Sequence, residues 1–179
     1  SRAAGLTCSV PGLSGFAYVW FIVTSLVVCV DLTFVIMRPW SLTAKGQPWE
    51  TWQHYATFDK RYASMTDGWV LLQSYLNAGE VALQLLVVLF ALLGKNGAAH
   101  RLCIVVSSMT LWKTVIYFGM EHFEGYAFTK HNSTQDLLQM VVVPSAFWIL
   151  IPLVLIAQAW GRLAKGEEVL YERKEKKSA

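Results

Sequence analysis

Four apolar stretches, each long enough to cross a bilayer, limit what this chain can fold into. They lie at 16–37, 69–93, 102–123 and 137–160, and a membrane-spanning helix needs about 20 mainly apolar residues. Apolar residues make up 55% of the chain, against about 45 to 50% with glycine included in soluble domains. The sequence therefore predicts an all-α membrane protein, a bundle of four transmembrane helices.

Turn-forming and basic residues mark the ends of these stretches. Arg38-Pro39 closes the first stretch, Gly94 begins the turn between the second and third, and Gly161-Arg162 follows the fourth. Proline and glycine at such positions are typical of helix ends. Because the connection after the second stretch is short, we expect the second and third helices to be antiparallel neighbours.

The basic residues predict the orientation of the bundle. Lys95 and Arg101 lie in the short turn, and further basic residues gather in the C-terminal tail. The positive-inside rule places both regions in the cytosol, and four crossings then place the N-terminus there too. We expect a cytosolic N-terminal segment at 1–15, a four-helix membrane domain at 16–163 and a basic cytosolic tail at 164–179.

Two short patterns bear on the cellular location. Asn132-Ser133-Thr134 is an acceptor triplet for N-glycosylation in the loop opposite the cytosolic side, although such a short triplet also occurs by chance. Lys176 and Lys177, the fourth and third residues from the end, resemble a dilysine retrieval signal. The alternative is an ordinary solvated basic tail beside the membrane. Together the patterns predict a multi-pass protein of the endoplasmic reticulum membrane.

Cysteine use and charge exclude several other classes. The chain has three cysteines, Cys8, Cys29 and Cys103, with neither a disulfide framework nor a metal-binding spacing. The net charge is only +3, and the basic excess lies in the tail rather than among aromatic residues. We therefore expect no nucleic-acid partner, no metal and no cofactor.

Ionisable residues inside the apolar stretches point to a functional cavity. Asp31, Glu80, Lys113 and Glu121 all lie in these stretches, where a charge costs about 2.5 to 3.5 kcal/mol or more. At a rise of about 1.5 Å per residue, Glu80 and Lys113 lie at the same depth near the midplane. Asp31 lies about one to two helical turns nearer the non-cytosolic end, and Glu121 and His122 lie close to that end. We expect these groups to face a shared cavity.

Glu80 has two interpretations. It can form a structural salt bridge with Lys113, which reduces the cost of burying each charge. Alternatively, a carboxyl group in a low-dielectric pocket has a raised pKa and can donate a proton to a poor base such as an alkene. A nearby Lys113 opposes this second interpretation, because a cation lowers the pKa of the carboxyl group.

Trp148 is predicted to line the cavity. It lies between Pro144 and Pro152, and prolines in membrane helices open the backbone hydrogen-bond ladder and shape cavity walls. An aromatic wall beside acidic groups suits a hydrophobic ligand that carries or develops positive charge.

Three segments resemble one family of membrane proteins. Their motifs are Trp52-x-x-Tyr55-Ala56-x-x-Asp59-x-Arg61-Tyr62, Tyr117-Phe118-x-x-Glu121-His122 and Ala146-Phe147-Trp148-x-x-x-Pro152. They are similar, in order along the chain, to the sterol Δ8-Δ7 isomerase (emopamil-binding protein) branch of the EXPERA family, and Glu80 is placed like a glutamate of that branch. The first helix, with Asp31-Leu32-x-x-Val35-x-x-Arg38, resembles the sigma-2 receptor branch instead.

This resemblance implies a four-helix core around a lipid-accessible pocket for sterols or cationic amphiphiles. It leaves two function classes open. One is an isomerase-like enzyme that shifts a double bond or rearranges a polycyclic or isoprenoid lipid by proton transfer, without a cofactor. In that class Glu80 is the acid and Asp31 the partner base. The other is a non-catalytic binding or trafficking protein that takes up sterols and cationic amphiphiles.

The remaining site residues also come from the resemblance. The ligand-binding set that we expect is Lys113, Tyr117, Glu121, His122, Trp148 and Asp59. In their first core helix the isomerases have a His-x-x-x-Glu pair, but the comparable stretch of this chain has only Asp31. The class of non-catalytic binding proteins therefore stays open. The partner is a sterol or another polycyclic lipid, and apolar outer helix faces also permit a homodimer.

Overall fold

The fold is described by a computed structural model covering residues 10–46 and 48–178. These residues form helices, turns and loops without a strand, and four helical segments are long and apolar enough to span a membrane. Three of them are α1 (Gly15–Ile36), α4 (Gly68–Leu92) and α5 (Asn96–Phe123). The predicted fold class is confirmed, and the chain is a multi-pass membrane protein. Cys8 and most of the expected N-terminal segment lie outside the described residues.

The fourth span is continuous but changes its helix type. It begins with α6 (Thr134–Asp136), continues as a π-helix, η2 (Leu137–Val142), and becomes α7 (Val143–Ser178). Single π-helical turns are rare and are often found at functional sites. The change lies directly before Pro144, which has no N–H to donate to the helix ladder.

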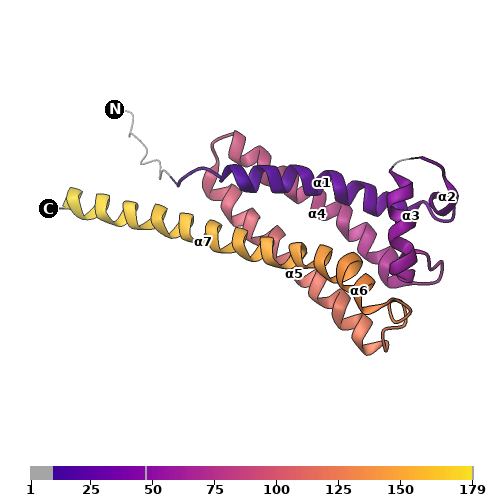
Figure 1. The fold of residues 1–179 in the computed structure, drawn as a ribbon. Coiled ribbons are helices and arrows are strands. Elements are labelled where there is room, and N and C mark those ends of the chain that lie inside the picture. The colour runs from indigo at the N-terminus through magenta and orange to yellow at the C-terminus, as the bar shows by residue number, and fades with distance from the viewer. Residues whose placement is uncertain (1–9, 47, 179) are drawn as a thin grey trace.

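The long helices form a bundle in which the start of α1 and the end of α7 lie at one side (Figure 1). α1 packs on α4, α4 on α5, and α5 on α7. The turn at 93–95 joins α4 to α5, with Gly94 at a φ of 70°, so these helices are antiparallel neighbours as expected. An apolar core near the chain ends includes Phe21, Val87, Val106 and Leu155, one from each long helix.

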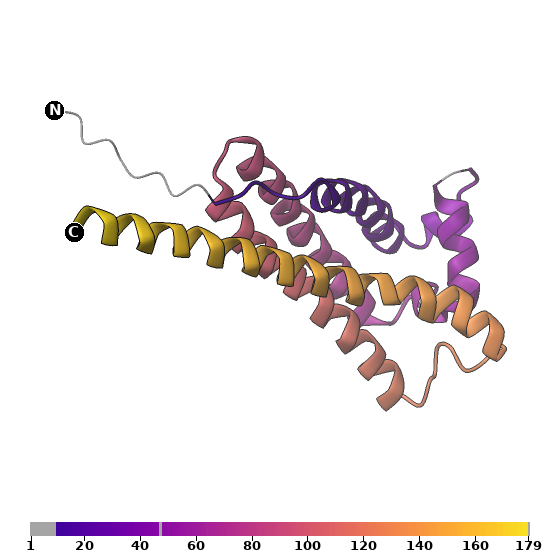
Figure 2. The ribbon, with the colours of Figure 1, turned by 60° about the vertical axis from the view of Figure 1, so that its left-hand side comes forward.

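α1 and α7 meet near the end of the bundle that carries the termini. The Ser14 hydroxyl donates to Gln158 Oε1 over 3.1 Å, and the ring centroids of Trp20 and Trp148 lie 5.6 Å apart. The two helices are antiparallel, because α1 begins and α7 ends at this side of the bundle in both ribbon views (Figures 1 and 2). Beyond Trp148, a pocket rather than packed side chains separates them.

Short helices cover the opposite end of the bundle. They are α2 (Trp40–Thr43), α3 (Trp49–Phe58) and η1 (Lys60–Tyr62), and α3 lies across the bundle end (Figure 1). Asp67 caps α4 by accepting from the backbone N–H groups of Trp69 and Val70 at 2.8 and 3.1 Å, as expected of a residue at that position. No helix was predicted between the first two apolar stretches, so these short helices are a new finding.

Two helix ends differ from the sequence expectation. α5 starts at Asn96 rather than Leu102, because the turn needs only 93–95. α7 does not end at Gly161 but continues to Ser178. The residues after Gly166 are mostly glutamate, lysine, arginine and leucine, which favour helix. Glu172 and Lys176 are four residues apart, a spacing at which opposite charges stabilise a helix. The predicted tail is therefore largely an extension of α7.

Candidate functional site

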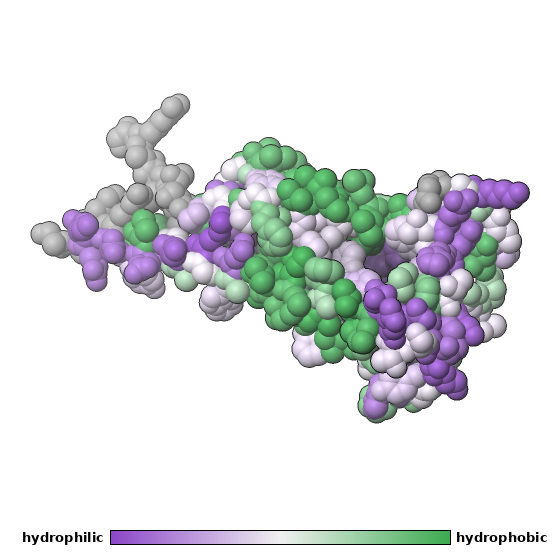
Figure 3. Space-filling model, viewed as in Figure 1, coloured by the Kyte–Doolittle hydropathy of each residue, from purple (hydrophilic) through white to green (hydrophobic). Residues whose placement is uncertain are grey.

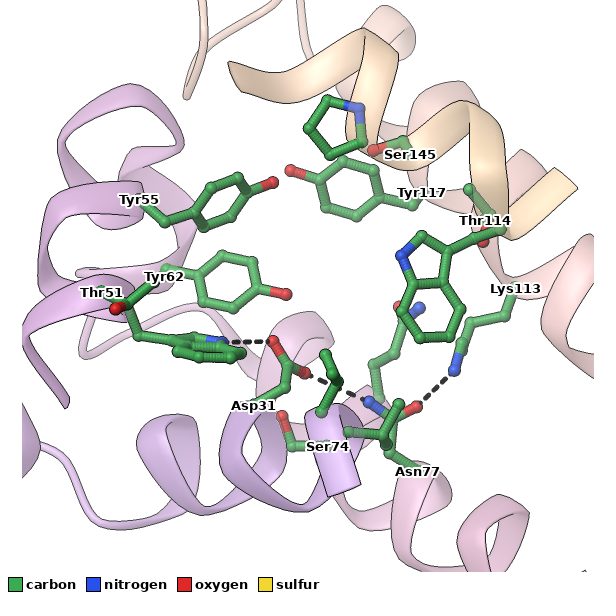
Figure 4. A pocket seen from close by; sticks show the side chains of 16 residues that line it. Asp31, Thr51, Tyr55, Tyr62, Ser74, Asn77, Lys113, Thr114, Tyr117 and Ser145 are labelled. Atoms are coloured by element: carbon green, nitrogen blue, oxygen red, sulfur yellow. Dashed lines mark hydrogen bonds between the residues drawn. The ribbon is translucent and has the colours of Figure 1, made fainter. Parts of the chain in front are cut away.

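A pocket of about 270 Å³ lies inside the bundle at the end that α3 covers (Figure 4). This volume is close to the lower end of the range of about 300 to 1,000 Å³ for small-molecule sites. α1, α3, α4, α5 and α7 all contribute to its wall, together with Tyr62 of η1. The charged and aromatic residues that line it are Asp31, Trp52, Tyr55, Tyr62, Lys113, Tyr117 and Trp148.

The pocket borders the lipid-facing surface of the bundle. Val27 of α1 and Pro144 and Trp148 of α7 line it on facing helices. Figure 3 shows a hollow between these two helices, where the green apolar surface meets the purple polar end of the molecule. The pocket therefore reaches the surface of the molecule between α1 and α7.

Asp31 is the acidic group of the pocket wall. Its Oδ1 accepts a hydrogen bond from Trp52 Nε1 at 2.9 Å, and its Oδ2 accepts one from Asn77 Nδ2 at 3.4 Å. Both donors are neutral, and within the described part of the chain Asp31 has no ion-pair partner. The carboxyl group of Asp31 is therefore held in place by neutral partners and is not part of an ion pair among the described residues.

Glu80 lies behind the pocket wall and pairs with Lys113. Lys113 Nζ donates to Glu80 Oε2 at 2.7 Å and to Asn77 Oδ1 at 2.6 Å. Thr110 and Gln84 donate to Glu80 Oε1 at 2.6 and 3.2 Å. The Glu80 side chain is only 2% exposed and is absent from the pocket lining, which includes Lys113. These contacts agree with the salt-bridge interpretation and confirm the equal depth of the two charges.

Asn77 connects the two charged sites. Its amide nitrogen faces Asp31 and its amide oxygen faces Lys113 (Figure 4). It follows Ser74 and precedes Glu80 by one helical turn each on α4, so all three residues lie on its buried face. This spacing was the sequence signal that could have identified Asn77.

Asp59 forms a second polar cluster at the other side of the pocket. It is 0% exposed, its Oδ1 accepts from the Arg61 backbone N–H at 3.1 Å, and its Oδ2 accepts from the Tyr117 hydroxyl. Burial raises the pKa of Asp59 to about 6, although the hydrogen bonds from Tyr117 and Arg61 act in the opposite direction. Burial and the charge of Asp59 raise the pKa of Tyr55 well above its usual value, so this phenol keeps its proton.

Arg61 organises a buried ionic cluster next to Asp59. Its guanidinium pairs with Asp67 at 2.6 Å, with Glu121 at 3.2 Å and with Glu124. It also lies 4.1 Å from the centroid of the Phe128 ring. Burial opposes its charge, but the hydrogen bond to Glu124 and the other carboxylates outweigh burial and raise the pKa of Arg61.

The structure separates the sequence-predicted residues into groups. Asp31, Lys113, Tyr117 and Trp148 line the pocket. Asp59 and Glu80 each lie one hydrogen bond behind a lining residue. Two further residues take no part in the pocket wall. Glu121 binds Arg61 and accepts from Thr129 at 2.7 Å, and the exposed His122 contacts the Tyr126 hydroxyl at 2.8 Å.

Sequence reasoning missed part of the pocket wall. Trp52 belongs to one of the family-like motifs but not to the expected ligand-binding set, and yet it donates a hydrogen bond to Asp31. Gln73 was not singled out, and its Oε1 is buried in the pocket wall without a hydrogen-bond partner among the described residues. An unsatisfied buried acceptor costs about 1 to 3 kcal/mol, so a hydroxyl or N–H donor on a ligand is favoured there.

The described residues contain no group of three or more His, Cys, Asp or Glu side chains arranged to hold a metal ion. A comparison with models of known protein families finds no match to the chain. A search among curated proteins finds none either. The functional proposal therefore depends on the chemistry of the pocket and on the motifs that line it.

Proposed function

We propose that this chain is an EXPERA-type membrane enzyme that binds a sterol or another polycyclic lipid in this pocket and shifts a double bond by proton transfer. The observation that carries the proposal is Asp31, a carboxyl group without an ion-pair partner among the described residues, in a pocket whose lining includes five aromatic side chains. The motifs behind the family resemblance also support it. Their residues Trp52, Tyr55, Tyr117 and Trp148 come from distant segments and line one pocket.

The pocket provides what an alkene isomerisation needs. A proton is added to one alkene carbon, a carbocation forms, and a proton leaves a neighbouring carbon as the new double bond forms. Once its proton has left, the Asp31 carboxylate can stabilise the positive charge together with the faces of Trp52 and Trp148, because fixed charges and aromatic faces attract cations. The Asp31 carboxyl group is the proton donor that best reaches a ligand, since Glu80 is absent from the pocket lining.

A second candidate function is binding without catalysis. The specific observation in its favour is Glu80, the expected acid, whose two oxygens already accept hydrogen bonds from Thr110, Gln84 and Lys113. In this case Asp31 pairs with the ammonium group of a cationic amphiphile, and the pocket stores or transfers lipids.

Conversion of a Δ8-sterol distinguishes the two functions. Membranes from an isomerase-deficient host that expresses the chain should form Δ7 product, and Asp31→Asn should abolish it. Cys29→Ala is the matched control, because Cys29 is an exposed residue on the same helix and its replacement should leave turnover unchanged. Absence of product with saturable binding of sterol and of a cationic amine supports the binding function. Absence of both contradicts either function.

We also propose that both termini face the cytosol and that the protein resides in the endoplasmic reticulum. Four crossings place both ends on one side, and the basic residues of the 93–95 turn and of the α7 extension lie on that side. A fluorescent reporter fused to the chain should co-localise with a marker of the endoplasmic reticulum membrane. Single cysteines at Lys95 and Thr57 should be labelled from opposite sides of sealed microsomes.

A further inference from the structure

A tyrosine pair lies across the pocket from Asp31. In Figure 4 the hydroxyl groups of Tyr55 and Tyr117 point toward each other, on the side of the pocket away from Asp31 and Asn77. The Tyr117 hydroxyl also donates to Asp59 Oδ2. Tyr117 lines the pocket, whereas Asp59 lies behind it and is 0% exposed. A chain of two groups therefore leads from the ligand space to a buried carboxylate.

Neither group alone is suited to remove a proton from a ligand. A phenol is a poor base while it keeps its proton, and Asp59 does not reach the pocket. Together they can act as a base. The Tyr117 oxygen takes up a proton from the ligand while the Asp59 carboxylate accepts the original phenol proton. Such a linked acid–base pair contributes to catalysis when its hydrogen bond is already formed.

We propose that Tyr117 and Asp59 form a second proton-transfer group, which acts on the ligand from the side opposite Asp31. This inference rests on the proposed isomerase function. In the first step the Asp31 carboxyl O–H bond breaks and a C–H bond forms at one alkene carbon, which leaves a carbocation. In the second step the C–H bond of a neighbouring carbon breaks, and its electron pair forms the new double bond.

The released proton goes to Tyr117 Oη, and the original Tyr117 proton moves to Asp59 Oδ2. The lipid product has the same atoms and charge as the substrate. Asp31 ends the cycle as a carboxylate and Asp59 as a carboxylic acid, and proton exchange of both groups with water restores the starting state. Tyr117 is the catalytic residue of the pair, and Asp59 is a positioning residue that acts through it.

The surroundings of Asp59 suit this role. It faces Tyr117 and Glu121 from α5, Tyr55 from α3 and Arg61 from η1. The charge of Glu121 raises the pKa of Asp59, and the charge of Arg61 lowers it. With burial, the result is a pKa of about 6. Asp59 is therefore ionised at neutral pH and can still take up a proton during turnover.

The test uses the full chain in lipid nanodiscs with a Δ8-sterol, and measures kcat and KM between pH 5 and pH 8. The variants are Tyr117→Phe, Asp59→Asn and the control Tyr75→Phe, whose side chain is exposed on α4 outside the pocket. We expect kcat to fall at least about tenfold in the first two variants, since general acid–base groups contribute about 10²-fold or more. KM and binding of a cationic amine should change by less than twofold.

The pH profile separates a chemical role from a structural one. The kcat of the unmodified chain should fall as the pH drops below about 6, because Asp59 is then protonated. The residual activity of Asp59→Asn should lack this acidic limb, while Tyr75→Phe should keep it. A merely structural role of Asp59 would lower activity equally at every pH.

Three results overturn the inference. Turnover within twofold of the unmodified chain in both Tyr117→Phe and Asp59→Asn overturns it and leaves the proposed function intact. An acidic limb that persists in Asp59→Asn also overturns it. If Asp59→Asn has misfolded and binds no amine, the kcat of Tyr117→Phe alone tests the inference, because this variant loses only one oxygen atom. Failure of the unmodified chain to convert any sterol overturns the proposed function, and this inference with it.

Discussion

Replacing Lys113 with methionine should destabilise the bundle strongly. The change keeps most of the side-chain volume but removes the ammonium group, which donates to Glu80 at 2.7 Å and to Asn77 at 2.6 Å. Glu80 would then be a buried carboxylate with only neutral donors. An isolated buried charge is far more costly than a buried ion pair, so the pair should be required as a unit.

The contacts of both side chains set the size of the effect. Breaking a buried pair typically costs about 3 to 5 kcal/mol. Glu80 is 2% exposed and Lys113 is 20% exposed beside the pocket, so water can reach the site in part and the lower value applies. We expect Lys113→Met to lower the free energy of unfolding by about 3 kcal/mol. Glu80→Gln in the same background should recover part of this loss, because no buried charge then remains.

Equilibrium unfolding of the four proteins of this double-mutant cycle measures the effect. The proteins are compared in one detergent at one pH, with helix content followed by circular dichroism. For a chain of this size, about 3 kcal/mol corresponds to a fall of about 6 to 12 °C in Tm. Additive effects of the two substitutions, or a loss below about 1 kcal/mol for Lys113→Met, would refute the reasoning, because contacting charges must couple.

Three further predictions concern the end of the bundle that α3 covers. Burial raises the pKa of Asp59 from 3.8 to about 6 in the folded chain, so its contribution to stability is greatest at low pH and should fall by about 1 kcal/mol between pH 5 and pH 7. Asp59→Asn should remove that part of the pH dependence of unfolding. Trp52→Phe deletes the donor to Asp31 and should lower the free energy of unfolding by about 1 to 3 kcal/mol. A loss as small as that of Trp40→Phe, an exposed indole, would show that this hydrogen bond contributes little. Asn132 donates to the carbonyls of Phe58 and Thr129 at 2.7 and 2.8 Å, so we expect its amide to carry no glycan. A mass shift after endoglycosidase treatment would contradict this.

The membrane spans could be predicted closely because apolar length is a strong signal. α1 and α4 begin and end within one residue of their predicted bounds. The α7 extension could not be predicted from the same signal, because Gly161-Arg162 suggested that the helix ends there. Glycine only weakens a helix, by about 1 kcal/mol relative to alanine, and good helix formers on both sides overcome that cost.

The site was predictable where residues share a depth on adjacent spans. Counting residues placed Glu80 and Lys113 together, and they do pair. The depth of Glu121 was also clear, but its partner Arg61 was not. Arg61 comes from a segment that folds back over the bundle end, and hydropathy does not describe such a fold. For the same reason Trp52, on α3, could not be assigned to Asp31.

The opening between α1 and α7 decides how the affinity of this protein has to be expressed. A ligand that enters from the hydrocarbon is present at a mole fraction of the bilayer, and its bulk aqueous concentration is small. Adding empty vesicles while the total amount of ligand stays constant should therefore lower the fraction of pockets that hold ligand, because the added lipid dilutes the ligand within the membrane. Affinities from different membrane preparations become comparable only after they are scaled to the amount of lipid.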